Sequence, residues 1–382
     1  MSNSNAIEPP EKLSTHPPPP PSLSSLPDEI VLSCLARIPR SHHLNISWVS
    51  RNLRSLVRSP QLNLLVDRTL HKNSLHVCLE KDDHSSFHWL TLKETSTKEY
   101  GLVPNPTPFP SHPNYDSSTV TVGSKIFCIG GPRGEPSTDL WILDTKSGTI
   151  TQGPSMTVPR DEHKAAVGVI DGKIYVIGGQ PLNFSDDGNI HEEEEILVEV
   201  FDPKSETWEL AGTENVRRSL RCSASVEGKV YMVEYKKTGV YNPREGEGER
   251  LVHMVSERLS DGGSKDKLKD MVYCVCVVED VLFAFFNRTG LMWFDTQLNV
   301  WRSLVGRDGK ELPLVPCVDG MAEYEGRLVV MYTDFDGSNS VQCMFVSLDR
   351  ARGKICGTID WSGILATLPY SFRFLHCLAV SE

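Results

Sequence analysis

The 382-residue sequence lacks the features that would place it in a membrane or outside the cell. No apolar run approaches the roughly 18 residues needed to cross a bilayer. No charged and then apolar leader opens the chain, and none of its ten cysteines forms a C-x-x-C pair. These absences predict a reduced intracellular protein without membrane association, located in the cytoplasm, the nucleus or both.

Acidic residues outnumber basic ones, and the sequence shows no catalytic or metal-binding motif. The net charge is −11, although residues 26–72 hold seven basic residues against three acidic ones. Because phosphate binding requires a positive surface, the acidic main region argues against a nucleic-acid partner. His191 precedes Glu192–Glu195, but consecutive carboxylates in a loop rarely converge on one ion. With no Ser/His/Asp or Cys/His motif either, we expect no metal site, no cofactor and no catalytic residue.

The first 25 residues contain Pro9-Pro10 and five consecutive prolines at 17–21. Proline lacks a backbone N–H and has a fixed φ, so this segment favours extended polyproline II and cannot build a core. We interpret residues 1–25 as a disordered leader. A proline-rich ligand for an aromatic groove is the alternative interpretation.

Residues 26–72 have the apolar spacing of short helices. Pro27 suits a helix start, and Asp28 and Glu29 suit the positive end of the helix dipole. Further helical patterns cover 44–49, 53–57 and 62–70. Helices this short bury little surface alone, so we expect the segment to need a partner.

From about residue 73 the apolar period changes to two, which predicts strands. Strand–turn–strand units recur at 120–131, 167–179, 225–234, 277–286 and 323–332. Their equivalent turn positions are Ser124, Gly172, Gly228, Asp280 and Gly326, spaced by 48, 56, 52 and 46 residues. A period near 50 is that of kelch propellers, and leucine-rich, ankyrin and tetratricopeptide repeats are shorter.

Each unit is followed by a second strand pair, as in VEVFDPKSETWEL at 198–210, so that one repeat supplies the four strands of a propeller blade. Five units are internal. A sixth is split: residues 75–80, 88–93 and 100–103 resemble a blade without its first strand, and 374–380 resemble that missing strand. Pairing 374–380 with 75–80 would close the ring and remove two open edges. The predicted fold for residues 73–382 is an all-β propeller of about six blades.

The segment LPDEIVLSCLARIPRSHHLNISWVSRNLRSLVRSP (26–60) resembles the F-box. It carries Leu-Pro-Asp-Glu, Ile-Pro, Val-Ser-Arg and Arg-Ser-Leu in order and at F-box spacing, with Leu53 where many F-boxes have tryptophan. The repeats resemble kelch blades, with the diglycine at 130–131 and 178–179 and other residues in its place in later blades. Together they are similar to the F-box/kelch-repeat family of plants. The expected domains are the leader (1–25), the F-box with a linker helix (26–72) and the kelch propeller (73–382).

This resemblance implies a substrate receptor of a Skp–cullin–F-box ubiquitin ligase. The F-box would bind a Skp-family adaptor, and through it a cullin, while the propeller binds a target protein for ubiquitination. By position, the adaptor contact would come from Leu26, Pro27, Ile30, Leu35, Ile38, Pro39, Leu44 and Val49. The alternative is that these helices form a cap packed on the propeller itself.

For the target, the resemblance places the loops between second and third strands and between fourth and first strands on one face. Those loops include 131–138, 154–163, 180–195 and 211–221. Five arginines in or beside them would meet an acidic target: Arg133, Arg160, Arg217, Arg218 and Arg221. Two other functions stay open, a propeller enzyme and a scaffold that assembles no ligase.

Overall fold

The computed structural model divides into two compact units, Met1–Thr69 and Leu70–Glu382. It describes residues 26–381 with gaps. The gaps are 37, 39–45, 60, 63–72, 83–85, 96–98, 106–107, 111–114, 116, 132–134, 162–164, 181–192, 218–220, 236, 247–249, 256, 260–264, 268–269, 314, 316–317, 334–337 and 352–353. Within these ranges, no helix is long and apolar enough to cross a membrane. The predicted leader, residues 1–25, lies outside the described residues.

The first unit contains two of the expected short helices, α1 (Asp28–Leu35) and α3 (Arg51–Val57). Pro27 is the residue before α1, and Asp28 and Glu29 occupy the first turn, where the helix dipole favours acids. Ser50 caps α3, because its hydroxyl accepts a hydrogen bond from the Leu53 amide at 3.1 Å. Of the helical pattern at 44–49, residues 46–49 are described, with Ile46 and Ser47 helical and Trp48 and Val49 in a turn. The pattern at 62–70 falls outside the described residues except for Leu62, which is helical.

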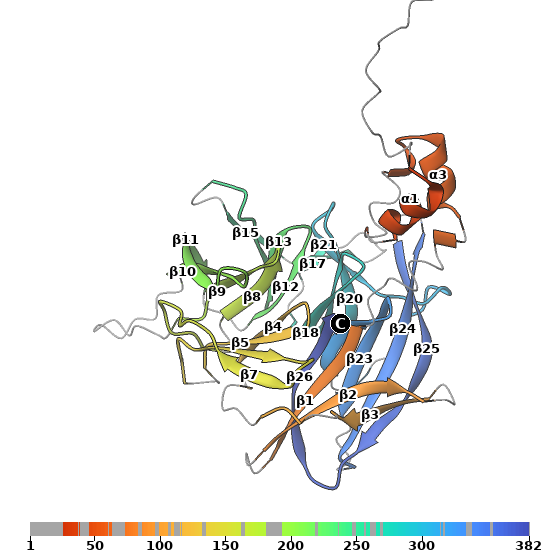
Figure 1. Ribbon diagram of the computed structural model, residues 1–382. Helices are drawn as coiled ribbons and strands as arrows, with labels where there is room; N and C mark the ends of the chain where they lie inside the picture. The colour runs from red at the N-terminus through yellow and green to blue at the C-terminus, as the bar shows by residue number, and fades with distance from the viewer. Residues whose placement is uncertain are drawn as a thin grey trace, which may run out of the picture. The chain divides into compact units, whose positions relative to one another are not determined.

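The second unit is a six-bladed β-propeller (Figure 1). Blade 1 consists of β26 (Phe372–Ser381), β1 (Asn73–Lys81), β2 (Phe87–Glu94) and β3 (Tyr100–Pro104). Blade 2 consists of β4 (Ser118–Val122), β5 (Lys125–Ile129), β6 (Leu140–Asp144) and β7 (Thr149–Gln152). Blade 3 consists of β8 (Ala165–Ile170), β9 (Lys173–Gly178), β10 (Glu193–Asp202) and β11 (Thr207–Arg217).

The other three blades repeat this antiparallel order. Blade 4 consists of β12 (Arg221–Val226), β13 (Lys229–Glu234), β14 (Lys237–Tyr241) and β15 (Leu251–Val255). Blade 5 consists of β18 (Val272–Val278), β19 (Val281–Phe286), β20 (Gly290–Asp295) and β21 (Val300–Ser303), extended by β16 (Glu257–Leu259) and β17 (Lys265–Lys267). Blade 6 consists of β22 (Val318–Tyr324), β23 (Arg327–Thr333), β24 (Ser340–Ala351) and β25 (Lys354–Thr367).

The ring closes as the sequence predicts. The last strand, β26, is drawn in dark blue in Figure 1 beside β1 in orange, and the two pair antiparallel from Asn73↔Ser381 to Lys81↔Phe372. Leu75 pairs with Ala379, and Leu79 pairs with Phe374. Blade 1 therefore joins both ends of the propeller chain and leaves no open edge between them.

The core consists of apolar layers between neighbouring blades. Alternate residues of one strand serve two layers: Ile126 and Cys128 on β5 pack toward blade 1, whereas Phe127 and Ile129 pack toward blade 3. This division follows from the period of two along a strand. The same arrangement recurs around the whole ring, so each blade is held by both of its neighbours.

Tight turns fall where the sequence places them. Asp171 and Gly172 both have positive φ, as do Glu279 and Asp280 in blade 5. Two successive residues with positive φ give the type I′ turn, whose twist matches that of the flanking strands. These turns set the register of the first two strands in their blades.

Candidate functional site

The first unit holds the segment that resembles the F-box, and we call it the F-box unit. It buries one set of apolar residues and exposes another. Val31, Leu32 and Leu35 of α1 are buried. Leu26 and Ile30, in contrast, keep 42% and 49% of their surface exposed. A hydrogen bond of 3.3 Å from the Asn52 side chain to Asp28 joins the start of α3 to the start of α1. The two helices therefore present apolar side chains that they do not use to pack on each other.

The eight residues predicted to contact an adaptor fall into three groups. Leu26, Pro27, Ile30 and Val49 are exposed, and Val49 keeps 75% of its surface accessible. Leu35 is buried and Ile38 is half-buried, so Leu35 supports the helix instead of offering a free surface. The remaining two, Pro39 and Leu44, lie outside the described residues.

One exposed residue in this unit was missed by the sequence analysis. Trp48 keeps 72% of its surface accessible, and the guanidinium carbon of Arg54 lies 5.6 Å from the centroid of its ring. The available signal was a tryptophan directly before Val49 in an otherwise polar stretch. We define Leu26, Ile30, Trp48 and Val49 as the exposed apolar set of the F-box unit.

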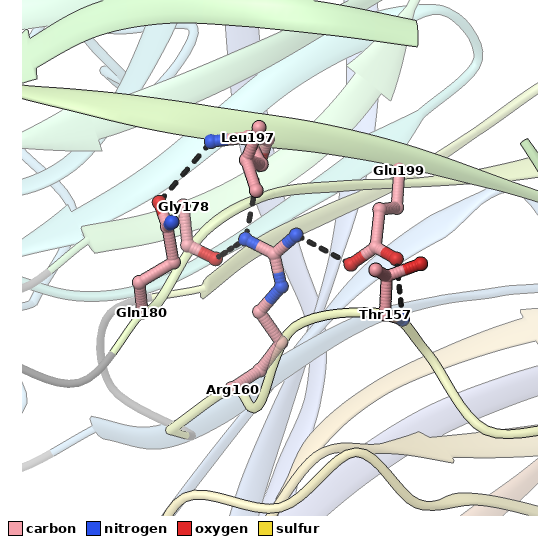
Figure 2. A network of polar contacts seen from close by, with 6 residues as sticks. All are labelled: Thr157, Arg160, Gly178, Gln180, Leu197 and Glu199. Carbon is pink, nitrogen blue, oxygen red and sulfur yellow. Dashed lines mark hydrogen bonds and ion pairs between the residues drawn. The ribbon is translucent and has the colours of Figure 1, made fainter. Parts of the chain in front are cut away.

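On the propeller, the interpretation of Arg160 as an exposed loop arginine is wrong. Arg160 is completely buried, and Figure 2 shows its guanidinium between backbone carbonyls on one side and Glu199 on the other. It donates hydrogen bonds to the carbonyls of Gly178 at 2.6 Å and Leu197 at 3.1 Å, and it forms a 2.6 Å ion pair with Glu199. Arg160 is therefore a structural residue of blade 3.

The backbone around Arg160 explains why it turns inward. Its amide and carbonyl pair with Ser137, and its carbonyl also accepts a hydrogen bond from Gly131. Gly130 has φ +80°, and a Cβ there would lie only 2.7 Å from the Arg160 carbonyl oxygen. The first glycine of the diglycine thus lets the segment before blade 3 approach blade 2 closely. With its backbone fixed against blade 2, the Arg160 side chain reaches the second and third strands of blade 3.

Electrostatics in this network favour a charged arginine despite its burial. Loss of solvent lowers the pKa of Arg160, and the hydrogen bond and charge of Glu199 act in the opposite direction. Glu199 accepts a further hydrogen bond from the Thr157 amide at 2.7 Å, while Gln180 accepts one from the Leu197 amide at 3.1 Å (Figure 2). Most of the buried polar groups around the guanidinium are thus paired within the propeller.

The side chains of the other four predicted arginines lie outside what the structure describes. Arg133 and Arg218 lie outside the described residues. Arg217 ends β11 and pairs with Glu193, whereas Arg221 begins β12 and pairs with Glu234; of these two, only the backbone is described. The predicted loops 180–195 and 211–221 are therefore partly strand, because β10 and β11 extend beyond β9 as a two-stranded ribbon.

The same end of the propeller carries exposed apolar residues that the sequence did not indicate. Tyr235, Met271 and Tyr273 are each about half exposed, and we call them the tyrosine patch. The Cys222 thiol donates to the Tyr273 carbonyl at 3.3 Å, so β12 and β18 lie side by side there. Tyr235 directly follows β13, whose last residue pairs with Arg221. The patch therefore spans the ends of blades 4 and 5.

A buried carboxylate fixes the backbone under this patch. Asp270 accepts a hydrogen bond from the Met271 amide at 2.9 Å. It also accepts three of 2.8 Å from the Arg288 amide, the Thr289 amide and the Thr289 hydroxyl. These contacts join the start of β18 to the β19–β20 turn. The blade 5 part of the patch, Met271 and Tyr273, thus follows a fixed backbone, which lowers the entropy cost of binding.

The cysteine thiols on the first strands of blades 4, 5 and 1 do not have the properties of nucleophiles. Burial raises the pKa of Cys222 and of Cys377 to about 12, and it raises the pKa of Cys274 well above its ordinary value. Such thiols stay protonated at neutral pH. Among the described residues, no three His, Cys, Asp or Glu side chains are grouped to hold a metal. Of the acidic cluster, His191 and Glu192 lie outside those residues, and Glu193–Glu195 begin β10.

Comparison with known proteins agrees with this architecture. The family model of the FKB95 kelch-repeats domain matches residues 78–366, and that of the F-box domain matches residues 23–65. The chain belongs to the F-box/kelch-repeat family. A putative F-box/kelch-repeat protein of Arabidopsis thaliana is 40% identical over 94% of this chain and 98% of its own length. A second F-box/kelch-repeat protein from that plant is 35% identical over 99% of this chain and 100% of its own.

Within this F-box/kelch-repeat protein, the diglycine has a visible role. Blades 2 and 3 keep it, and the chain crosses closely between them at Arg160. In blade 4 the corresponding residues are Val233 and Glu234, and Glu234 is buried beside Lys237 at 3.1 Å. The blades that lack the diglycine keep the four-stranded order, so the plant-type family fold does not depend on it.

Proposed function

We propose that this F-box/kelch-repeat protein is the substrate-recognition subunit of a Skp–cullin–F-box ubiquitin ligase. The observation that carries the proposal is the contrast between its two units. The exposed apolar set of the F-box unit is joined on one chain to a closed propeller with internally packed blades. Four exposed apolar side chains in so short a unit suit a protein interface.

The adaptor interface would centre on Leu26, Pro27, Ile30 and Val49. Their exposure allows each side chain to be buried by a partner, and full burial of an aliphatic side chain contributes about 1.5–3 kcal/mol. Leu35 and Ile38 would hold α1 in position behind them. Pro39 and Leu44 stay in the proposed interface on the strength of the family resemblance.

The target would bind at the end of the propeller that carries the tyrosine patch. Arg217 ends β11 and Arg221 begins β12 there. Arg133 and Arg218 stay in the proposed target face on the strength of the family resemblance. Aromatic residues together with arginines suit a target segment that combines apolar and acidic side chains. The tyrosines would supply the affinity, and the arginines would increase the association rate.

In this function the protein itself performs no catalysis. The adaptor would connect it to a cullin, which carries a ubiquitin-charged conjugating enzyme, and the propeller would hold the target's lysines within reach. We place this activity in the cytoplasm, the nucleus or both. A propeller enzyme and a scaffold without a ligase are the competing functions, and nothing in the described residues favours either.

The deciding experiment is adaptor binding by the full chain. Purified protein should bind a Skp-family adaptor, and changing Leu26 and Pro27 to Ala should abolish binding because it removes two exposed apolar contacts. The melting temperature of the propeller should stay unchanged, since the substitutions lie in the other unit. Changing the exposed Leu298 to Ala in the propeller is the matched control. A double variant that still co-purifies with the adaptor would overturn the proposal.

A further inference from the structure

Trp48 is an unusual residue to leave in solvent. Its indole is 72% exposed, next to Val49 at 75%. Burial of a tryptophan side chain removes about 150–250 Å² from water, more than any aliphatic residue in the exposed apolar set. A partner that covers this residue would therefore gain more apolar contact from it than from Leu26 or Ile30.

Arg54 holds the indole in place. Its guanidinium carbon lies 5.6 Å from the ring centroid, within the range of a cation–π interaction. The Arg54 Nε also donates a hydrogen bond of 3.2 Å to the Ser47 carbonyl, so the guanidinium itself is anchored to the backbone beside Trp48. A side chain fixed before binding loses less conformational entropy when a partner closes over it.

The charges on α3 indicate the chemistry of that partner. Arg51, Arg54 and Arg58 are exposed, and α3 contains no acidic residue. Their spacing of three and four residues places them on one helix face, where like charges repel and weaken a helix. Arg51 also faces an unfavourable dipole at the start of α3. A surface with carboxylates would relieve both costs.

We propose that Trp48 is the anchor of adaptor recognition. Its indole inserts into an apolar pocket of the Skp-family adaptor, and carboxylates at the rim of that pocket meet Arg51 and Arg54. Arg54 acts as a positioning residue that holds the indole in its binding orientation. This inference rests on the adaptor binding proposed above, and it adds a contact that the family resemblance did not place. Tryptophan is enriched among residues that dominate interface energies, and arginine is enriched beside it.

The first test is a titration of the full chain with a purified Skp-family adaptor. Trp48→Ala should weaken binding about thirtyfold or more, the loss typical of a dominant interface residue. Trp48→Phe should lose less, because a ring remains. Arg54→Leu should weaken binding about three- to tenfold and reduce its dependence on salt. Leu210→Ala, a change at an exposed leucine of the propeller, is the control and should bind as wild type.

The outcomes separate this inference from the proposed function. If wild-type protein does not bind the adaptor, the proposed function fails, and the inference fails with it. If wild type binds and the Leu26→Ala, Pro27→Ala variant does not, but Trp48→Ala binds within threefold of wild type, the Trp48 anchor is overturned while the receptor function stands.

A second measurement does not depend on how a Trp48→Ala variant folds. The chain has seven tryptophans, and full-length protein labelled with 5-fluorotryptophan should give fluorine resonances that Trp48→Phe assigns by the loss of one signal. Saturating adaptor should shift the Trp48 resonance, because a buried indole leaves water. The signals of Trp293 and Trp301, which are buried in the propeller, should stay in place. A Trp48 signal that does not move when the adaptor is bound would overturn the inference.

Discussion

The two units of this protein treat their apolar residues in opposite ways. The propeller packs each blade against two neighbours, and its chain ends meet in blade 1, so that large side chains such as Trp301 and Phe345 are fully buried. The F-box unit has two described helices of eight and seven residues and leaves Trp48 and Val49 in solvent. A ring of blades can bury its apolar side chains within itself, whereas two short helices do not have enough surface to bury theirs.

This difference predicts which property of each unit a mutation will impair. Damage to the propeller should appear as lost stability, because its residues contact one another. Damage to the exposed apolar set should appear as lost binding, because those residues contact little else in the described structure. A surface substitution that unfolds the propeller would contradict this contrast. So would a disruption of the ring closure that leaves the propeller folded.

The largest effect should follow from opening the ring. Deletion of residues 372–382 removes β26, which exposes the edge of β1 and uncovers the apolar residues that β26 packs against in blade 6, so we expect loss of the fold or aggregation. Light scattering and circular dichroism measure both. A truncated protein that stays monomeric with an unchanged melting temperature would show that closure contributes little.

The next effect should come from the buried ion pair. Arg160→Ala leaves Glu199 buried without its partner, and we expect unfolding free energy to fall by about 3–5 kcal/mol. Urea denaturation measures the loss. The matched control is Arg244→Ala, which removes an exposed ion pair with Asp171 and should cost no more than about 1 kcal/mol. Equal losses for the two variants would contradict a structural role for Arg160.

A smaller, pH-dependent effect should come from Glu323. Burial, together with Glu279 and Asp280 in a neighbouring turn, raises the pKa of Glu323 to about 7 from an ordinary value of 4.5. The folded state therefore holds the proton more tightly than the unfolded state. Its contribution to stability is fully present below pH 4.5 and is lost as the pH rises through 7.

Glu323→Gln should remove this dependence, because glutamine stays neutral. Relative to wild type, the variant should gain about 1–3 kcal/mol between pH 4.5 and pH 8. Thermal melts across that range measure the difference, with the exposed Glu209→Gln as control. Parallel pH profiles for wild type and Glu323→Gln would show that Glu323 titrates normally.

The smallest effect on stability should come from the proposed target arginines. Changing Arg217, Arg218 and Arg221 together to Glu should alter the melting temperature little if they occupy a binding face. Adaptor binding should survive, while the set of proteins captured in proteasome-inhibited cells should shrink. Identical captured sets for wild type and the triple variant would remove these arginines from the target face.

Much of the fold was predictable from local patterns. The strand periods and the turn positions are confirmed, because each depends on alternation and turn chemistry within a short stretch. The pairing of β26 with β1 is confirmed as well, and it followed from the repeat, because 374–380 resemble the first strand that the blade at 75–103 lacks. The two described helices likewise follow from apolar spacing and an N-terminal cap. The resemblance to the F-box and to kelch repeats could be recognised because those motifs are also local patterns.

The site was less predictable. Arg160 follows Pro159 in a segment that reads as a polar loop, and nothing local shows that its side chain will meet Glu199, 39 residues later. The tyrosine patch joins residues from two blades, so no single repeat reveals it. Leu35 and Ile30 belong to one apolar stripe, yet one is buried and the other exposed.

Local patterns along the chain specify the family and the repeat, because alternation, turn residues and spacing act between near neighbours, and the incomplete first repeat then identifies the strand that closes the ring. Which side chains reach a surface depends on the tertiary structure. Burial depends on what packs against a residue from distant segments: it sends Arg160 inward to Gly178, Leu197 and Glu199, and it leaves Trp48 in solvent beside Arg54.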